Sequence, residues 1–358
     1  ESSPLDWRPQ IIHCNDWPVA LAPAYLHYTP QPRAAAVMTV HNLAFQGNFE
    51  PDLGAALGLP ESSFAVDGLE FHGRMSFLKA GLLYADAITT VSPTYAREIQ
   101  SETLGFGMDG LLHLRRDSLF GILNGIDTAV WNPETDPLIA HNYSASTLDN
   151  KLINKQALQQ YLQLAQEPEI PLLGVVSRFT QQKGIDVLVE AASRLVELPV
   201  QLVALGTGER KLEHALRTVA ARHPRNIAVA IEYDENLAHL IEAGADMFLM
   251  PSRFEPCGLN QMYSQRYGTP PIARATGGLV DTIADCNPGT LGNGSASGFL
   301  FNQLTAAELL SAVRRAVAMY RDRRSWRVLQ QNGMARYFGW DTAARQYAGI
   351  YARLASSV

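Results

Sequence analysis

The feature that most constrains the fold is a repeated alternation of short apolar runs with longer amphipathic stretches. Many of the apolar runs end at a glycine or aspartate turn, and the following stretch has its apolar residues at a helical period. Alternation of this kind predicts βαβ units and parallel sheets. With 358 residues, the chain is longer than one ordinary hydrophobic core supports, so two such domains are expected.

The alternation runs through both halves of the chain. In the first half the predicted strands are residues 10–13, 35–40, 87–91 and 121–123, with helices over 19–28, 75–84 and 93–100. In the second half the predicted strands are residues 172–177, 201–205, 227–231, 247–250 and 271–273, with helices over 185–197, 210–222, 235–243 and 259–267. Residues 305–354 have a helical pattern. We therefore expect an α/β protein with two Rossmann-like domains facing a cleft.

A linker is predicted at residues 130–137, where the sequence VWNPETDP interrupts the pattern. This places the first domain at residues 1–131 and the second at 132–340. The chain begins without methionine and its first predicted strand follows almost at once, so we expect it to begin inside a domain.

Charge and composition exclude several classes of protein. The net charge is -6, from 29 basic and 35 acidic residues without a basic run, which argues against a nucleic-acid partner. The apolar runs are short and interrupted, so neither a transmembrane helix nor a signal peptide is predicted. Cys14, Cys257 and Cys286 lack the CxxC spacing, which favours a reducing cytoplasm over a disulfide framework.

The loops that follow strands carry the candidate chemistry, because ligands bind at the carboxyl ends of parallel strands. Arg178 and Lys183 share one loop that ends at Gly184 and opens a helix. Two cations at a helix N-terminus can neutralise a diphosphate and stabilise it as a leaving group. A solvated surface loop is the alternative for this loop taken alone.

A second loop with candidate chemistry is the segment 251–261, PSRFEPCGLNQ. Glu255 could accept hydrogen bonds from sugar hydroxyls, although a helix-capping acid is the alternative. For Cys257 a small buried apolar side chain is favoured over a nucleophile. Two further glycine loops, 274–281 and 205–209, have tight turns as their alternative reading.

Polar residues also follow strands in the first half. His41 and Asn42 lie in a glycine-containing loop after one strand, and Asp16 and Trp17 follow another. Asn124 follows the last predicted strand of this domain. Together with the second-half loops, they indicate a site for a phosphate and a polyol.

Other chemistries have no signal in the sequence. The chain contains no DxD spacing of the kind that bridges a metal to a diphosphate, and no HExxH motif or close His/Cys set for zinc. It contains no GxSxG elbow for a hydrolase nucleophile. We therefore expect neither a metal nor a cofactor.

Several motifs together resemble glycogen and starch synthases of the bacterial ADP-glucose type. They are residues 41–47 (HNLAFQG), 91–96 (VSPTYA), 123–127 (LNGID), 177–184 (SRFTQQKG) and 253–259 (RFEPCGL). The resemblance runs in order from about Asp6 to Leu354. It implies a GT-B fold, a last helix over residues 341–358 that crosses back to the first domain, and transfer of glucose from ADP-glucose to the non-reducing end of an α-1,4-glucan with retention.

The resemblance also implies roles for individual residues. Arg178 and Lys183 would hold the diphosphate, and Glu255 would bind hydroxyls of the donor glucose. His41 and Asn124 would contact this glucose, and Asp16 would lie near the reacting centre. Asn42 and Trp17 would also bind substrate. The segment Cys257, Gly258, Leu259 and Asn260 would hold the distal phosphate, and Tyr233 would lie against the adenine. The sequence shows no evident nucleophile. The mechanism is therefore carried over from the family: the acceptor attacks on the face from which the leaving group departs, and the leaving group assists the attack.

Two departures from the family pattern stand out. Position 260 is Asn where some bacterial members have Thr, a change that a backbone phosphate site should tolerate. The Lys-x-Gly-Gly loop after the family's first strand has no match upstream of Asp6, so we expect an N-terminally truncated chain with an incomplete first domain.

Three alternatives remain open at this point. A catalytically impaired fragment would bind only glucan or nucleotide. An α-glucan phosphorylase would need a pyridoxal-phosphate lysine. Transferases that use UDP- or GDP-sugars often have a second Glu where this chain has Tyr263, which favours the synthases. The oligomeric state is not predicted.

Overall fold

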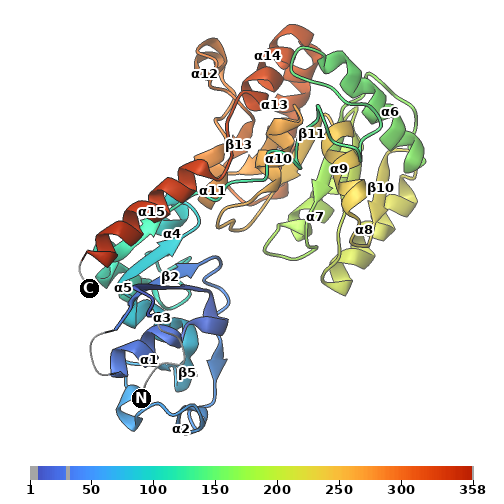
Figure 1. Cartoon of the computed structure of the whole chain (residues 1–358). Coiled ribbons are helices and arrows are strands. Elements are labelled where there is room, and N and C mark those ends of the chain that lie inside the picture. The colour runs from blue at the N-terminus through green and yellow to red at the C-terminus, as the bar shows by residue number, and fades with distance from the viewer. Residues whose placement is uncertain (1–6, 30–32, 357–358) are drawn as a thin grey trace. The chain divides into compact units, whose positions relative to one another are not determined.

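A computed structural model describes residues 7–29 and 33–356, so Asp6, where the resemblance begins, lies outside the described residues. The chain divides into two compact units, residues 1–124 with 341–358 and residues 125–340 (Figure 1). This division falls after Asn124, a few residues before the predicted boundary at residue 131. Residues 125–131 belong to the second unit because Ile126 forms a bridge with Gly339 and Gly125 lies against Trp340.

The second unit is built on a six-stranded parallel sheet in the order β10-β9-β8-β11-β12-β13. Its strands are β8 (Leu172–Val176), β9 (Gln201–Leu205), β10 (Ile227–Ala230), β11 (Met247–Met250), β12 (Pro271–Arg274) and β13 (Phe299–Phe301). Numbered from β8, this order is 3-2-1-4-5-6, the Rossmann order, in which the chain reverses direction across the sheet between β8 and β11. The predicted Rossmann-like arrangement of this half is confirmed, and β13 is an addition that its three-residue length concealed.

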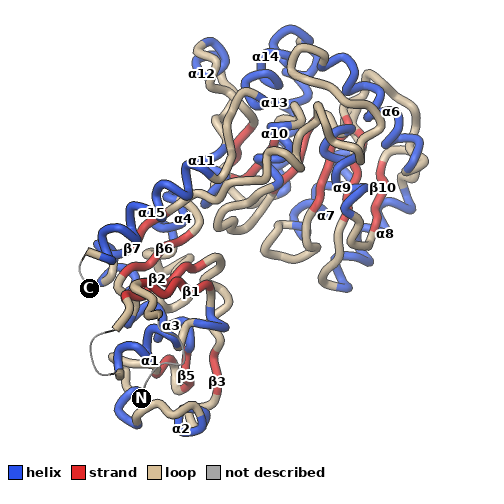
Figure 2. The backbone as a smooth tube through the Cα atoms, viewed as in Figure 1, coloured by secondary structure: helices blue, strands red, loops and turns tan. Residues whose placement is uncertain are grey.

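Helices cover both faces of this sheet (Figure 2). The helices of this unit are α6 (Lys151–Tyr161), α7 (Ile185–Leu195), α8 (Arg210–Arg222), α9 (Glu235–Gly244), α10 (Asn260–Arg266), α11 (Gly277–Thr282), α12 (Pro288–Gly292), α13 (Ala306–Arg321) and α14 (Arg323–Met334), preceded by the short 3-10 turn η4 (Leu148–Asn150). Along β9, Leu202 and Ala204 join the core that packs on α7, α8 and α13, whereas Val203 and Leu205 join the core that packs on α6 and α9. Strand side chains alternate between faces, so an all-apolar strand supplies two cores.

The first unit contains a four-stranded parallel sheet in the order β1-β2-β6-β7 and a small antiparallel sheet in the order β3-β5-β4. The strands are β1 (Ile11–Asn15), β2 (Ala35–Val40), β3 (Asn48–Phe49), β4 (Glu70–Phe71), β5 (Arg74–Ser76), β6 (Ala87–Thr90) and β7 (Leu119–Gly121). The helices and 3-10 turns are η1 (Trp17–Val19), α1 (Ala22–Tyr28), α2 (Leu53–Ala56), η2 (Glu61–Ser63), α3 (Phe77–Tyr84), α4 (Pro93–Glu98), α5 (Asp109–Leu114), η3 (Arg116–Ser118) and α15 (Asp341–Ala355).

The last helix, α15, belongs to the first unit. Its buried residues Ala343 and Ile350 form one hydrophobic cluster with Val37, Ala87 and Ile122 of the parallel sheet. Among the described residues, no helix has the length and apolar character that crossing a membrane requires.

Several predicted elements differ from the observed ones for local reasons. The helix predicted over 19–28 begins only at Ala22, since Pro23 is tolerated only in a first turn. The helix predicted over 75–84 begins at Phe77, because Ser76 ends β5 and caps α3 by accepting a hydrogen bond from the Lys79 N–H. The stretch 305–354 forms three helices, and Asp322 separates the first two as the cap of α14.

Candidate functional site

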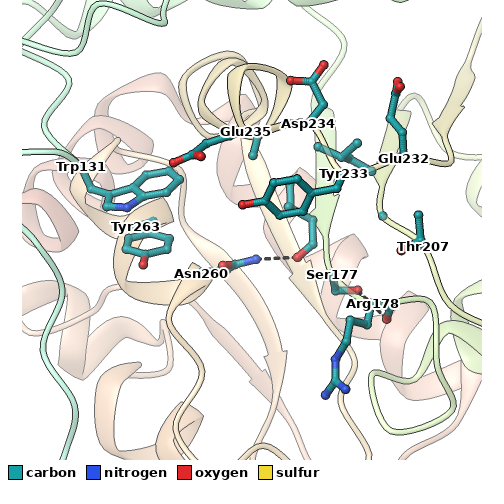
Figure 3. Close-up of a pocket in the computed structure, with 14 residues that line it drawn as sticks. Trp131, Ser177, Arg178, Thr207, Glu232, Tyr233, Asp234, Glu235, Asn260 and Tyr263 are labelled. Carbon is teal, nitrogen blue, oxygen red and sulfur yellow. Dashed lines mark hydrogen bonds between the residues drawn. The ribbon is translucent and has the colours of Figure 1, made fainter.

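A pocket of about 300 Å³ lies in the second unit beyond the carboxyl ends of its strands (Figure 3). Loops after β8, β9 and β10 supply most of its wall, and α9, α10 and Trp131 supply the rest. Its lining residues are Trp131, Val176, Ser177, Arg178, Leu205, Gly206, Thr207, Glu232, Tyr233, Asp234, Glu235, Ala238, Asn260 and Tyr263. The pocket thus lies beside the point where the strand order reverses, which is where open α/β sheets bind ligands.

Aromatic side chains form one end of the pocket. The Trp131 indole is stacked between His239 and Tyr263, with ring centroids 3.8 Å away on each side. Tyr233 is 89% exposed, and Figure 3 shows its hydroxyl directed toward the Trp131 and Tyr263 side of the pocket. A flat ring could therefore bind at this end by stacking.

A buried polar network holds Trp131 in place. Asp136 Oδ2 lies 2.7 Å from His239 Nδ1 and accepts a 2.6 Å hydrogen bond from the Tyr267 hydroxyl. Burial and Asp136 together raise the pKa of Tyr267 far above its ordinary value. The segment predicted as a linker is thus part of the pocket wall, and Trp131 is a lining residue that the sequence analysis missed. The available signal in the sequence was a large aromatic residue, Trp131, in a segment that is otherwise mostly polar.

Arg178 lies toward the opposite end of the pocket, and Asn260 lies between it and the aromatic end (Figure 3). Arg178 is exposed, with a hydrogen bond of 3.5 Å from its guanidinium to Gln182 Oε1. The Asn260 side-chain amide donates a 2.5 Å hydrogen bond to the carbonyl of Val176 at the end of β8. The Asn260 amide therefore ties α10 to β8, while Arg178 is the cation at the mouth.

Lys183 and Glu255, which are distant in the sequence, meet in the second unit. Lys183 Nζ lies 2.6 Å from Glu255 Oε2, and the Glu255 side chain is 5% exposed. Ser252 Oγ donates a second hydrogen bond of 3.0 Å to the same oxygen. Glu255 begins no helix, so its alternative reading as a helix cap is wrong.

The backbone of the 251–261 loop lies very close to two glycines on neighbouring loops. At Gly184, which has φ +68°, an added Cβ would lie 1.7 Å from the carbonyl oxygen of Pro251. At Gly277, with φ +47°, it would lie 1.9 Å from the carbonyl oxygen of Glu255. Only glycine adopts such a φ freely and leaves room for the facing carbonyl. The glycine loop 276–278 therefore packs directly against the backbone of Glu255.

The other predicted residues of this loop have different surroundings. Cys257 is buried, in agreement with the apolar reading that the sequence favoured. Gly258 adopts φ +72°, and Leu259 is partly exposed. The backbone from Gly258 to Asn260 leads into α10 beside the pocket.

In the first unit, the loops after β1 and β2 bring Asp16 and His41 together. Asp16 Oδ1 accepts a 2.8 Å hydrogen bond from the His41 backbone N–H, and Asn15 Oδ1 lies 2.9 Å from His41 Nε2. Asp16 holds a φ of 58° and a ψ of 178°, a backbone conformation that is freely open only to glycine, so the backbone is strained at this residue. Asn42 Oδ1 accepts a hydrogen bond from the Ala44 N–H in the same loop.

The remaining two predicted residues of this unit are Trp17 and Asn124. Trp17 packs its ring near Phe49 and Phe77, at 5.8 and 6.5 Å between centroids, so it is a packing residue of the first unit. Asn124 follows β7 and is partly exposed. It lies on a loop that leaves the same carboxyl-terminal edge of the parallel sheet.

The second-unit pocket has a stacking surface and an exposed guanidinium, and the buried Glu255 carboxylate lies outside its lining, paired with Lys183 on the loop that Arg178 shares. Such a set can bind a nucleoside diphosphate sugar, with the base on the aromatic end and the phosphates on the cations. Among the residues that the structure describes, no group of three His, Cys, Asp or Glu side chains is arranged to hold a metal ion.

Comparison with known protein families gives two matches. Residues 2–114 match the starch synthase catalytic domain, and residues 162–328 match the glycosyl transferases of group 1. The glycogen synthase of Nitrosospira multiformis is 56% identical over 354 residues, which cover 99% of this chain and 71% of that protein. The glycogen synthase of Aromatoleum aromaticum is 57% identical over 350 residues, covering 98% of this chain and 71% of that protein.

Two solved structures are also similar. The catalytic domain of starch synthase IV from Arabidopsis thaliana, bound to ADP and acarbose, matches with a TM-score of 0.92 and 34% identity, over 98% of this chain and 73% of that one. Sucrose-phosphate synthase from Thermosynechococcus elongatus matches with a TM-score of 0.64 and 21% identity, over 98% of this chain and 74% of that one. At that identity the second match shows the fold alone.

Proposed function

Because the chain belongs to the family of glycogen and starch synthases, a glucosyltransferase family with the GT-B fold, we propose that it transfers glucose from ADP-glucose. The acceptor is the non-reducing end of an α-1,4-glucan, and the α-configuration is retained. The resemblance in the sequence motifs is thereby confirmed as membership of the family. The family settles the enzyme class against the phosphorylase alternative.

The observation that carries the donor proposal is the difference between the two ends of the pocket in the second unit, one aromatic and the other cationic. Its aromatic end offers the rings of Tyr233 and Tyr263 to a base, and Arg178 offers a cation to the phosphates. In Figure 3 the Glu235 carboxylate is directed toward Trp131. A carboxylate accepts hydrogen bonds, so it suits the exocyclic amine of adenine better than the carbonyl oxygens of uracil. The starch synthase IV structure, which contains ADP, supports this donor.

In the proposed reaction the bond between glucose C1 and the β-phosphate oxygen breaks as the acceptor hydroxyl oxygen bonds to C1. The acceptor proton passes to the departing phosphate on the same face. Positive charge develops on the sugar and negative charge on ADP. Arg178 and Lys183 stabilise ADP, and Glu255 accepts hydrogen bonds from the glucose hydroxyls.

The first unit contributes the polar residues that the family resemblance assigns to the glucose. We infer contacts from His41, Asn42 and Asn124, with Asp16 near the reacting centre. The Asp16 carboxylate fixes the His41 backbone, which supports a fixed position for this loop. We further propose that the reaction uses neither a metal nor a cofactor.

The test is incorporation of labelled glucose from ADP-glucose into glycogen, with UDP-glucose as the competing donor and EDTA in parallel samples. We expect incorporation that EDTA leaves unchanged, and a higher kcat/KM for ADP-glucose. The assay is run on this chain and on a chimera that adds the parts of the Nitrosospira multiformis protein that lie outside the matched region. No incorporation by either protein would overturn the proposal, and a preference for UDP-glucose would correct the donor.

A further inference from the structure

We propose that Ser252 is a positioning residue that orients Glu255 for the donor glucose, an inference that rests on the function proposed above. Ser252 follows β11 and is 1% exposed. Its hydroxyl donates a 3.0 Å hydrogen bond to Glu255 Oε2. Nothing in the sequence motif distinguishes this serine from a residue of a tight turn.

The two partners of Glu255 share one of its oxygens. Lys183 Nζ lies 2.6 Å from Oε2, and Ser252 Oγ reaches that same atom. Both bonds that the structure describes for this carboxylate therefore converge on Oε2. They fix the plane of the group and leave Oε1 as the acceptor for a sugar hydroxyl.

The serine has a task that the lysine alone cannot perform. A diphosphate that binds at the 178–184 loop competes with Glu255 for the ammonium group of Lys183. If Lys183 turns toward the phosphate, its hold on the carboxylate weakens at the moment when the glucose arrives. Ser252 is neutral and does not respond to the phosphate, so its hydrogen bond persists and keeps Glu255 in place.

The backbone around Ser252 is firmly held, which makes such positioning effective. The Arg253 N–H donates a 2.8 Å hydrogen bond to the Gln182 carbonyl, and the Arg253 side chain lies 2.7 Å from Asp186. On the other side the Gly278 N–H donates to the Glu255 carbonyl at 3.1 Å. Ser252 and Glu255 are thus anchored to neighbouring loops at separate points.

The test compares Ser252→Ala, which removes the hydroxyl, with Ser252→Thr, which keeps it. For Ser252→Ala we expect kcat to fall about tenfold or more, while the Kd for ADP stays within about twofold. Ser252→Thr should retain most of the wild-type kcat. Calorimetry should also show weaker ADP-glucose binding by Ser252→Ala, relative to ADP, even without turnover. Lys183→Ala, in contrast, should weaken the binding of both ligands.

A double-mutant cycle separates positioning from a general structural role. If Ser252 acts through Glu255, Ser252→Ala should change kcat by less than about threefold in a Glu255→Ala background. An equal loss of kcat in both backgrounds, or an unchanged kcat in the single variant, would overturn the inference. If the wild-type protein transfers no glucose at all, the proposed function fails instead, and the ratio of ADP-glucose to ADP affinity still decides the role of Ser252.

Discussion

At the scale of single residues, the two cations of the 178–184 loop differ in their surroundings. Arg178 is exposed and donates a long hydrogen bond of 3.5 Å to Gln182, whereas Lys183 is paired with the buried Glu255. An exposed guanidinium can reorient toward a bound ligand at little cost in free energy, because it breaks no strong interaction. A paired ammonium group must exchange partners to reach a phosphate. The two cations are therefore expected to respond differently to the donor.

Tyr233 offers a direct test of the stacking end of the pocket. Tyr233→Ala removes an exposed ring, so we expect about tenfold weaker ADP binding from the loss of base stacking. The melting temperature should stay unchanged because the side chain buries little surface. Calorimetric titration with ADP measures the first effect, and thermal unfolding measures the second.

Tyr161→Ala is the matched control for this prediction. Tyr161 is also exposed, at the end of α6, but it does not line the pocket. Its loss should leave ADP binding unchanged. Equal ADP affinities for Tyr233→Ala and the wild-type protein would show that Tyr233 does not stack on the base.

At the scale of secondary-structure elements, a buried lysine at the start of α6 joins this helix to the end of α9. Lys151 Nζ donates hydrogen bonds of 2.7 Å to the Ala243 carbonyl and to Thr269 Oγ1, and one of 3.2 Å to the Glu242 carbonyl. Burial lowers the pKa of Lys151 to about 7. The carbonyls belong to the last turn of α9, whose dipole favours a cation or a strong donor there.

Lys151→Met should therefore destabilise the protein although it keeps the side-chain volume. The variant removes the buried donor to the Ala243 carbonyl and to Thr269 Oγ1, although the Glu242 carbonyl keeps its hydrogen bond from Thr269, and the loss costs about 2–4 kcal/mol of unfolding free energy. Urea unfolding measures the effect. Lys211→Met, at an exposed position of α8, should shift the unfolding free energy by less than about 0.5 kcal/mol. Comparable midpoints for the two variants would contradict this account.

At the scale of the whole molecule, the chain contains two units, and the first is assembled from both ends of the sequence. His13 of β1 lies 2.6 Å from the Tyr351 hydroxyl of α15 and 2.5 Å from Thr39 Oγ1 of β2. The centroids of the Tyr347 and His13 rings are 5.5 Å apart. One histidine thus connects the last helix to the parallel sheet.

The stability of the first unit is expected to depend on the protonation of His13. Burial and, to a smaller extent, the nearby charge of His41 lower the pKa of His13 below its usual 6.5. The unfolded chain therefore takes up this proton at a higher pH than the folded chain. The stabilisation is complete above pH 6.5, and it is lost as the pH falls from there toward the folded pKa.

Unfolding at several pH values between about 7.5 and 5 checks this sign. The wild-type protein should lose more stability on acidification than His13→Gln, which keeps a side chain that can form hydrogen bonds but cannot titrate. The difference between the two proteins isolates His13 from His41 and the carboxylates. Parallel pH profiles for both proteins would contradict the prediction.

The sequence by itself determined the α/β class, most strands of both parallel sheets and the loops that carry Arg178, Lys183 and Glu255. These features follow from apolar periods and glycine turns, which are local and can be read along the chain. The same local reading placed Trp131 in a linker and gave Ser252 no role. It also missed β13 and α6, whose short or polar sequences have weak periods.

Only the tertiary structure decided which distant residues meet. Lys183 and Glu255 come from loops after different strands, and their 2.6 Å contact exists because β8 and β11 are neighbours in the sheet. Trp131 becomes a pocket wall because His239 and Tyr263 converge on it from two helices. Side-chain partnership depends on strand order and helix packing, which the whole chain determines. The sequence thus identified the reactive loops, and folding set which of their atoms act together.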